Sequence, residues 1–186
     1  MSIENKIDIE IFKVIKSAMC KSSDLEDMTN NLVQILTGAL EIRGCTLFVA
    51  NPDKKELEIL TSFGLSTDYL TKGAISTQKS IAAVYNQEPQ IILDTANTDL
   101  LQYPEDAQKE GIKSIISLPV IFSDKVIGEL RLYNHQSWNI SDYDLENLML
   151  FADHVGMAMM YTRLLNAFKL IKGTVEDIHD IWIDPH

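Results

Sequence analysis

The sequence predicts an α+β fold in which helices pack against an antiparallel sheet. Segments 45–63 and 114–134 have the strand-forming runs and polar turns of β-hairpins. Segments with helical spacing of apolar residues stand near both ends of the chain. The order helix-helix-strand-strand, a mixed segment, strand-strand-helix therefore favours one sheet with helices packed on it.

The N-terminal part of the chain predicts two helices. Residues 7–19 place Ile7, Ile11 and Ile15 on one stripe. A second helix is expected to begin at Ser23, whose hydroxyl can form a capping box with Glu26, and to continue to about residue 42.

The middle of the chain begins with the hairpin at 45–63, which turns at residues 51–53. Segment 64–113 has weaker periodicity. There we expect a short helix near 78–86, a strand at 90–94 and a helix at 104–110 that Gly111 closes.

The last predicted element is a long helix over 142–171. Ser141 is its N-cap, with Asp144 at N3, and Ile140 and Leu145 stand at the staple positions. We expect Gly173 to end the helix. This divides the chain into an N-terminal helix at 1–22, a domain at 23–172 and a short tail at 173–186.

The long helix is apolar nearly all round between Leu148 and Tyr161, so it has more apolar surface than one sheet can cover. A loop of the same chain could cover the second face. We favour the alternative, a homodimer in which helices 7–19 and 142–171 pack on a second copy.

The second hairpin carries Glu129 and Arg131 two residues apart in a strand. A two-residue turn would put both charges on the apolar face. A three-residue turn at 123–125 pairs Phe122 with Val126 and puts both charges on the opposite, mixed face. A buried unpaired charge costs several kcal/mol, so we predict the three-residue turn.

Composition narrows the class of protein. The 186 residues are 46% hydrophobic and carry a formal net charge of −11, which argues against a nucleic-acid or anionic-membrane partner. Two cysteines, an N-terminus unlike a signal peptide and no apolar run of about 20 residues indicate a cytoplasmic protein. The four histidines have no metal-ligand spacing, so no metal or haem is expected.

Four segments in order resemble the GAF domain family. They are GIKSIISLPVIFSDKVIGELRLYN at 111–134, QEPQIILDTANTD at 87–99, WNISDYDLENLMLFADHVGMAM at 138–159, and the helix and hairpin at 24–60. The resemblance implies a GAF-like, profilin/PAS-like sheet of five to six strands. Terminal helices would pack on one face, and loops and short helices would cover the other.

The resemblance also implies a ligand site between the sheet and segment 64–113, where many members hold a small molecule. The mixed face supplies Ser117, Glu129, Arg131 and Tyr133. Weaker candidates from other walls are Thr46, Phe48, Ser76, Ser80, Asp94, Asn97 and Tyr103. Such a cluster suits a small polar or zwitterionic ligand, with Arg131 on a carboxylate or phosphate and Glu129 on an amine. Pairing of Glu129 with Arg131 at the rim of the sheet is the alternative.

Some chemistries of the family fit the sequence poorly. Segment 64–113 has no cysteine, which argues against a covalent bilin and against cysteine-based redox catalysis there. Cys20 and Cys45 are expected to be small buried hydrophobes. We therefore expect a non-catalytic sensor module that signals through its terminal helices as a homodimer. A ligand-free interaction module is the alternative, and a cysteine-based redox enzyme is a third hypothesis.

Overall fold

A computed structural model describes residues 7, 9–21, 25–78 and 87–183. Six strands form one antiparallel sheet in the order β3-β2-β1-β6-β5-β4. The strands are β1 Gly44–Asn51, β2 Glu56–Phe63, β3 Ile75–Ser76, β4 Gln90–Ile92, β5 Ser114–Phe122 and β6 Lys125–Asn134. The predicted α+β class and the two predicted hairpins are confirmed.

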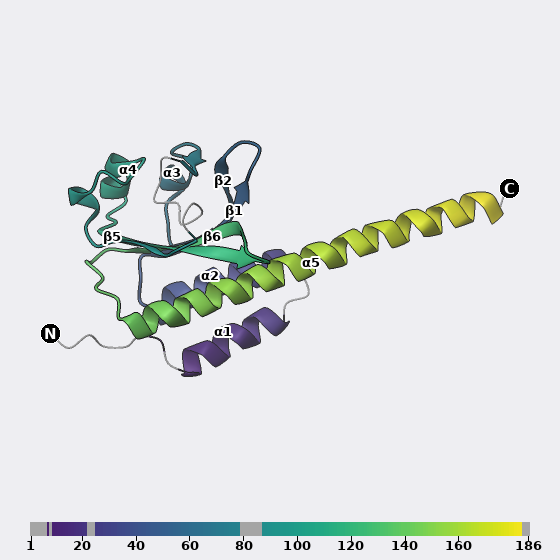
Figure 1. Cartoon of the computed structure of the whole chain (residues 1–186), viewed down its shortest axis with the longest axis horizontal. Helices are drawn as coiled ribbons and strands as arrows, with labels where there is room; N and C mark the ends of the chain where they lie inside the picture. Colours follow the sequence, from purple (N-terminus) through teal and green to yellow (C-terminus); the bar gives the residue numbers. More distant parts are fainter. Residues whose placement is uncertain (1–6, 8, 22–24, 79–86, 184–186) are drawn as a thin grey trace.

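The long helices lie on one side of the sheet and the short ones on the other (Figure 1). The long helices are α1 Ile9–Lys21, α2 Leu25–Ala39 and α5 Asp142–Ile183. The short ones are α3 Thr67–Leu70, the 3-10 helix η1 Thr95–Asn97 and α4 Pro104–Lys109. The predicted cap at Ser23 and most of the predicted helix near 78–86 lie outside the described residues.

The second helix ends three residues earlier than predicted, at Ala39. Glu41 adopts a positive φ of 52°. The N–H of Ile42 donates to the carbonyl of Thr37 at 3.2 Å, which closes the last turn of the helix. Helices commonly end at a residue in the left-handed conformation, which is usually a glycine, and here Glu41 takes that position.

The main core lies between the sheet and the long helices. Alternate residues of β1, β5 and β6 face α2 and α5, among them Leu47, Leu118 and Leu130. Helix α5 contributes a stripe at 3-4 spacing that is buried against the sheet: Leu148, Ala152, Val155 and Met159. The stripe ends at Met159, after which α5 extends past the body of the domain (Figure 1).

The beginning of α5 has the predicted cap. The hydroxyl of Ser141 accepts a hydrogen bond from the N–H of Asp144 at 3.0 Å. The carboxylate of Asp144, which is buried, accepts one from the N–H of Ile7 at 2.9 Å. This bond fastens the N-terminal segment to the first turn of the last helix.

The predicted end of α5 at Gly173 is wrong, because the helix continues to Ile183. A glycine inside a helix costs only about 1 kcal/mol relative to alanine. It ends a helix only when it turns into the left-handed conformation, and the residues after it contain no proline before 185.

The turn of the second hairpin also differs from the prediction. It has two residues, Ser123 and Asp124, both at positive φ, and Phe122 pairs with Lys125. A bulge follows, since Ile121 pairs with Val126 whereas Val120 pairs with Gly128. The extra residue restores the predicted register, so Glu129 and Arg131 still lie on the mixed face.

No helix among the described residues is long and apolar enough to cross a membrane.

Candidate functional site

The mixed face of the sheet holds an ion pair at its centre. Ser117 lies opposite Arg131 in the β5–β6 register. The Nε of Arg131 donates to Oε1 of Glu129 at 2.8 Å, and its Nη2 and the hydroxyl of Ser117 donate to the same oxygen. Ser117, Glu129 and Arg131 are buried residues, each at most 4% exposed. The sequence-predicted residues therefore form one buried, hydrogen-bonded cluster.

The second carboxylate oxygen of Glu129 has no hydrogen-bond partner among the described residues. Oε2 is buried, whereas Oε1 accepts three hydrogen bonds. An orphaned buried acceptor typically costs about 1–3 kcal/mol, and more when it is charged. Such a group is the kind of feature that a bound donor would satisfy.

Arg131 is held in its charged form. Burial is the largest single effect and acts to lower its pKa, but the charge and hydrogen bond of Glu129, together with Tyr133 and Tyr69, outweigh burial, and the net shift is upward. The guanidinium also lies 5.2 Å from the centre of the Phe48 ring, within the range of a cation–π interaction.

Two tyrosines, Tyr133 and Tyr69, pack together on the mixed face that carries the ion pair. The ring of Tyr133 meets that of Tyr69 edge to face, with centroids 5.8 Å apart. Tyr69 belongs to α3, so the mixed face does look toward segment 64–113 as predicted. Burial raises the pKa of Tyr133 to about 12 against the opposing effect of Arg131, and the phenol therefore stays neutral at physiological pH.

A second cation lies above the aromatic rings. The Nζ of Lys72 is 3.6 Å from the centre of the Tyr69 ring and 5.9 Å from that of Tyr103, and it donates to the carbonyl of Tyr69 at 2.7 Å. Burial, followed by the positive charge of Arg131, lowers the pKa of Lys72 to about 8.

The weaker candidates separate into two groups. Thr46 and Phe48 belong to the same face, because β1 pairs with β6 so that Thr46 lies opposite Arg131 and Phe48 opposite Glu129. The hydroxyl of Thr46 is 2.8 Å from that of Ser62.

The other weaker candidates have local structural roles. Asp94 caps η1 and accepts from Asn97 at 2.6 Å. The backbone N–H of Ser76 donates to Gln102, and the hydroxyl of Tyr103 donates to the carbonyl of Ala74 at 2.8 Å. These hydrogen bonds join residues of segment 64–113 to one another. Ser80 lies outside the described residues.

Sequence reasoning missed Tyr69 and Lys72. Tyr69 belongs to the short helix α3, which Ser66 caps by accepting from the N–H of Tyr69 at 3.2 Å, and Lys72 follows two residues after the end of that helix. The sequence feature that could have indicated this helix is Ser-Thr-Asp at 66–68, which is typical of a helix start. The short length of the helix concealed it.

Cys45 is a buried free thiol in the main core, and burial raises its pKa. This agrees with the predicted role of a small hydrophobe. The residues that the structure describes contain no group of three or more His, Cys, Asp or Glu side chains placed to hold a metal ion.

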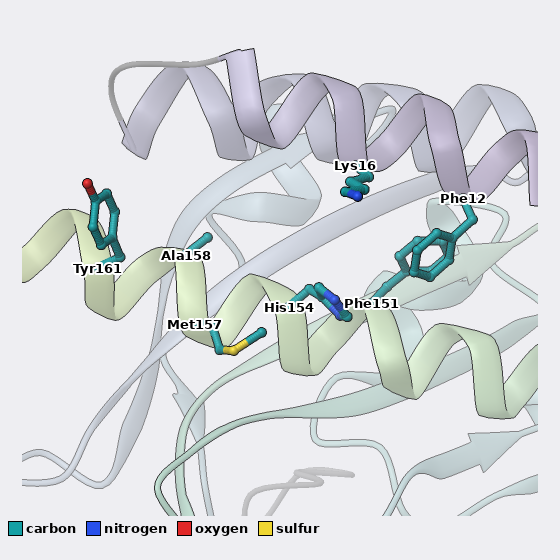
Figure 2. A pocket seen from close by; sticks show the side chains of 7 residues that line it. All are labelled: Phe12, Lys16, Phe151, His154, Met157, Ala158 and Tyr161. Carbon is teal, nitrogen blue, oxygen red and sulfur yellow. The ribbon is translucent and has the colours of Figure 1, made fainter.

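A separate hollow lies on the opposite side of the sheet, between α1 and α5. This groove of about 290 Å³ is almost entirely apolar (Figure 2). The rings of Phe12 and Phe151 stack in it with centroids 4.7 Å apart. Farther along α5 its wall is formed by His154, Met157, Ala158 and Tyr161.

Comparison with protein families identifies the class of the fold. A family model described as "GAF domain" matches residues 22–160, which is most of the chain. The chain belongs to the GAF domain family, a class commonly used as sensor and regulatory modules, as the resemblance implied. No curated protein gives a significant match.

Solved structures share the fold at low sequence identity. The GAF domain of a phosphoenolpyruvate-protein phosphotransferase from Coxiella burnetii is 18% identical with a TM-score of 0.75, over 88% of this chain and 99% of that chain. Free methionine-R-sulfoxide reductase from Neisseria meningitidis, solved with its substrate, is 14% identical with a TM-score of 0.70, over 88% and 98%. A region of a methyl-accepting chemotaxis protein is 22% identical with a TM-score of 0.66, over 82% and 99%.

Proposed function

We propose that this GAF domain is a non-catalytic sensor that binds a small polar molecule on the mixed face of its sheet. The observation that carries the proposal is the buried Oε2 of Glu129, which has no partner among the described residues while the rest of the cluster is satisfied. A ligand signals from there through the terminal helices of a cytoplasmic homodimer.

The hydrogen-bond arrangement favours a ligand that donates to Glu129. Two of the guanidinium nitrogens of Arg131 already donate to Glu129, so Arg131 acts first as the group that holds the carboxylate. Oε2 of Glu129 belongs to a face of the sheet that also carries Phe48, opposite Glu129 in β1, and Tyr133. This face suits an amine, a guanidine or an N–H-bearing ring, for which a carboxylate and aromatic faces are complementary. From the sequence we expected Arg131 to bind a carboxylate or phosphate of the ligand and Glu129 to bind an amine. The structure leads us to propose Glu129 as the main contact to the ligand.

Thermal denaturation with a panel of amines, amino acids and nucleobases tests the proposal. A binder should raise the melting temperature, and Glu129→Gln should remove that rise relative to its own ligand-free value. Arg131→Ala should do the same because Glu129 then loses its support. Glu105→Gln, an exposed carboxylate of α4, is the matched control and should retain the rise. A binder whose effect survives Glu129→Gln would contradict the proposed site.

A second candidate function is a ligand-free dimerisation module. The observation that favours it is the large exposed apolar surface of α5, together with the self-pairing of Ser117, Glu129 and Arg131. The ligand panel and sedimentation together separate the two functions: the ligand-free module should show a dimer and no rise in melting temperature with any ligand, whereas the sensor should show a rise that Glu129→Gln removes.

The third hypothesis, a cysteine-based redox enzyme, gains no support from the thiol of Cys45, whose burial disfavours the reactive thiolate. The similarity to a reductase keeps a direct assay worthwhile. Turnover of free methionine sulfoxide that is lost in a Cys20→Ala/Cys45→Ala variant would establish the enzyme reading.

A further inference from the structure

We propose that a basic hollow at the end of the sheet binds a small organic phosphate. The hollow has a volume of about 410 Å³, and its charged wall residues in the described part of the chain are Lys55, Lys125 and Arg163. It is separate from the ion pair of the mixed face, because neither Glu129 nor Arg131 lines it. The inference therefore goes beyond the proposed sensor function and does not depend on it.

The pairing of the strands brings the ends of the two hairpins together around the hollow. Strands β1 and β6 are antiparallel neighbours, so the end of β1 lies beside the beginning of β6. The turn that follows β1 carries Lys55, and β6 begins with Lys125. Helix α5 contributes Arg163, just beyond Met159, where the stripe buried against the sheet ends. Three elements far apart in the sequence therefore each supply one cation.

The three cations have no acidic partner in the hollow. No wall residue in the described ranges is Asp or Glu, and none of the three cations belongs to an ion pair among the described residues. The chain as a whole has 27 acidic and 16 basic residues, so carboxylates that could pair with them are plentiful. Like charges around one hollow repel one another, and a bound anion offsets that repulsion.

The neutral polar side chains of the wall are already engaged within the protein. The amide of Asn51 donates to Glu58 at 2.9 Å and accepts from the N–H of Lys54 at 3.1 Å. Thr77 donates its hydroxyl and its N–H to the carbonyl of Lys55, each at 3.0 Å. These two bonds hold the backbone of Lys55, whose φ is 56°, in the turn between β1 and β2. Among these wall residues, the cationic side chains are therefore the donors that remain for a ligand.

The rest of the wall is apolar and consists of Val49, Ala50, Pro52, Val126 and Ile127. Sites for small molecules typically have this composition, mostly apolar with a few charged groups, and volumes of about 300–1,000 Å³. Lysine and arginine both bind phosphate oxygens, and a phosphate monoester carries a charge of about −1.5 to −2 at pH 7. The hollow therefore fits a phosphate monoester whose organic part lies against the apolar wall.

The position of Arg163 gives such a ligand a structural effect. Lys55 and Lys125 belong to the hairpins, whereas Arg163 belongs to α5 and lies beyond the stripe that is buried against the sheet. A phosphate bound to all three side chains links α5 to the sheet at the place where the helix leaves the body of the domain (Figure 1).

Phenyl phosphate is the probe for the full chain, with inorganic phosphate and phenol as its two parts. Titration calorimetry in a phosphate-free buffer at low salt should give one site per chain with a Kd of about 1 mM or tighter for phenyl phosphate. Inorganic phosphate should bind at least about threefold more weakly, because it buries no apolar surface, and phenol should not bind. No binding of phenyl phosphate, or binding of phenol with the same Kd, would overturn the proposal. An equal Kd for inorganic phosphate would overturn the role of the apolar wall.

Single charge removals locate the site. Lys55→Gln and Arg163→Gln should each weaken the binding of phenyl phosphate about threefold, and the double variant should weaken it at least about tenfold. Both residues are exposed, so the variants should keep the circular dichroism and the melting temperature of the wild type. Lys54→Gln is the matched control, since Lys54 pairs with Glu58 and does not line the hollow, and it should bind as the wild type does. Unchanged binding in the double variant, or an equal loss in Lys54→Gln, would refute the assignment.

Hydrogen exchange tests the link between the ligand and α5. Amides of α5 next to Arg163 should exchange more slowly when phenyl phosphate is bound, because the ligand holds this part of the helix to the sheet. Amides of α4, on the other side of the sheet, are the internal control and should not change (Figure 1). Binding of phenyl phosphate without protection next to Arg163 would place the ligand elsewhere and overturn the proposal.

Discussion

The buried ion pair on β6 makes a quantitative prediction about stability. Arg131→Met removes the guanidinium and leaves the carboxylate of Glu129 buried with only the Ser117 hydroxyl as a described donor. Removing one partner of a buried pair typically costs about 3–5 kcal/mol. For a chain of this length, that loss corresponds to a fall in melting temperature of about 6–20 °C.

The matched experiment replaces both partners together. Glu129→Leu should cost as much as Arg131→Met, since it leaves a buried guanidinium without its carboxylate. The double variant should cost less than either single one, because apolar side chains of similar size need no partner. Urea unfolding followed by the fluorescence of Trp138, which is buried, measures all three.

Two results would refute this reasoning. A loss below about 1 kcal/mol in Arg131→Met would mean that solvent reaches the pair and screens it, as it screens exposed pairs. Additive losses in the double variant would mean that Glu129 and Arg131 stabilise the fold through separate contacts.

The remaining predictions concern packing, charge and the turn. In Gly156→Ala, the new Cβ would lie 2.5 Å from a carbonyl oxygen of β5, so urea unfolding should show a loss despite the better helix propensity, whereas Gly38→Ala, with nothing within 4 Å, should be neutral or gain up to about 1 kcal/mol. Unchanged stability in Gly156→Ala would mean that α5 can shift off the sheet. The pKa of Lys72 is about 8 in the folded protein and about 10.4 in the unfolded chain, so the unfolded chain binds more protons between these values. The free energy of unfolding should therefore rise from pH 8 to 9.5 more in the wild type than in Lys72→Met, and equal slopes would contradict the burial of the ammonium. Ser123→Asn/Asp124→Gly should raise the melting temperature because both positions have positive φ, and a fall in calorimetry would argue against this turn.

In the second hairpin, the orientation of the side chains could be predicted from the sequence, whereas the length of the turn could not. The faces of Glu129 and Arg131 followed from the alternation of apolar residues, which the core enforces over the whole strand. The turn did not follow, because a two-residue turn with one bulge gives the same register as a three-residue turn. Ser123 and Asp124 lack the Asn-Gly signal that would have indicated the shorter turn.

Segment 64–113 was the least predictable because its elements are short. A four-residue helix such as α3 has little intrinsic stability and depends on tertiary contacts, here the packing of Tyr69 on Tyr133. Periodicity cannot show such contacts. The cluster of Ser117, Glu129 and Arg131 was predictable because it lies on long strands, whereas Tyr69 and Lys72 were not.

In the proposed sensor, the hydrogen bond between Ile7 and Asp144 in the first turn of α5 would make the long helix a lever. The helix is anchored at one end and projects beyond Thr162 for about 32 Å. A tilt of about 5° at the body would move its far end by about 3 Å. Gly173 has the lowest helix propensity of the residues in this projecting segment, so Gly173→Ala should stabilise the segment without changing the domain, and in the proposed sensor it should alter the signal and not ligand binding.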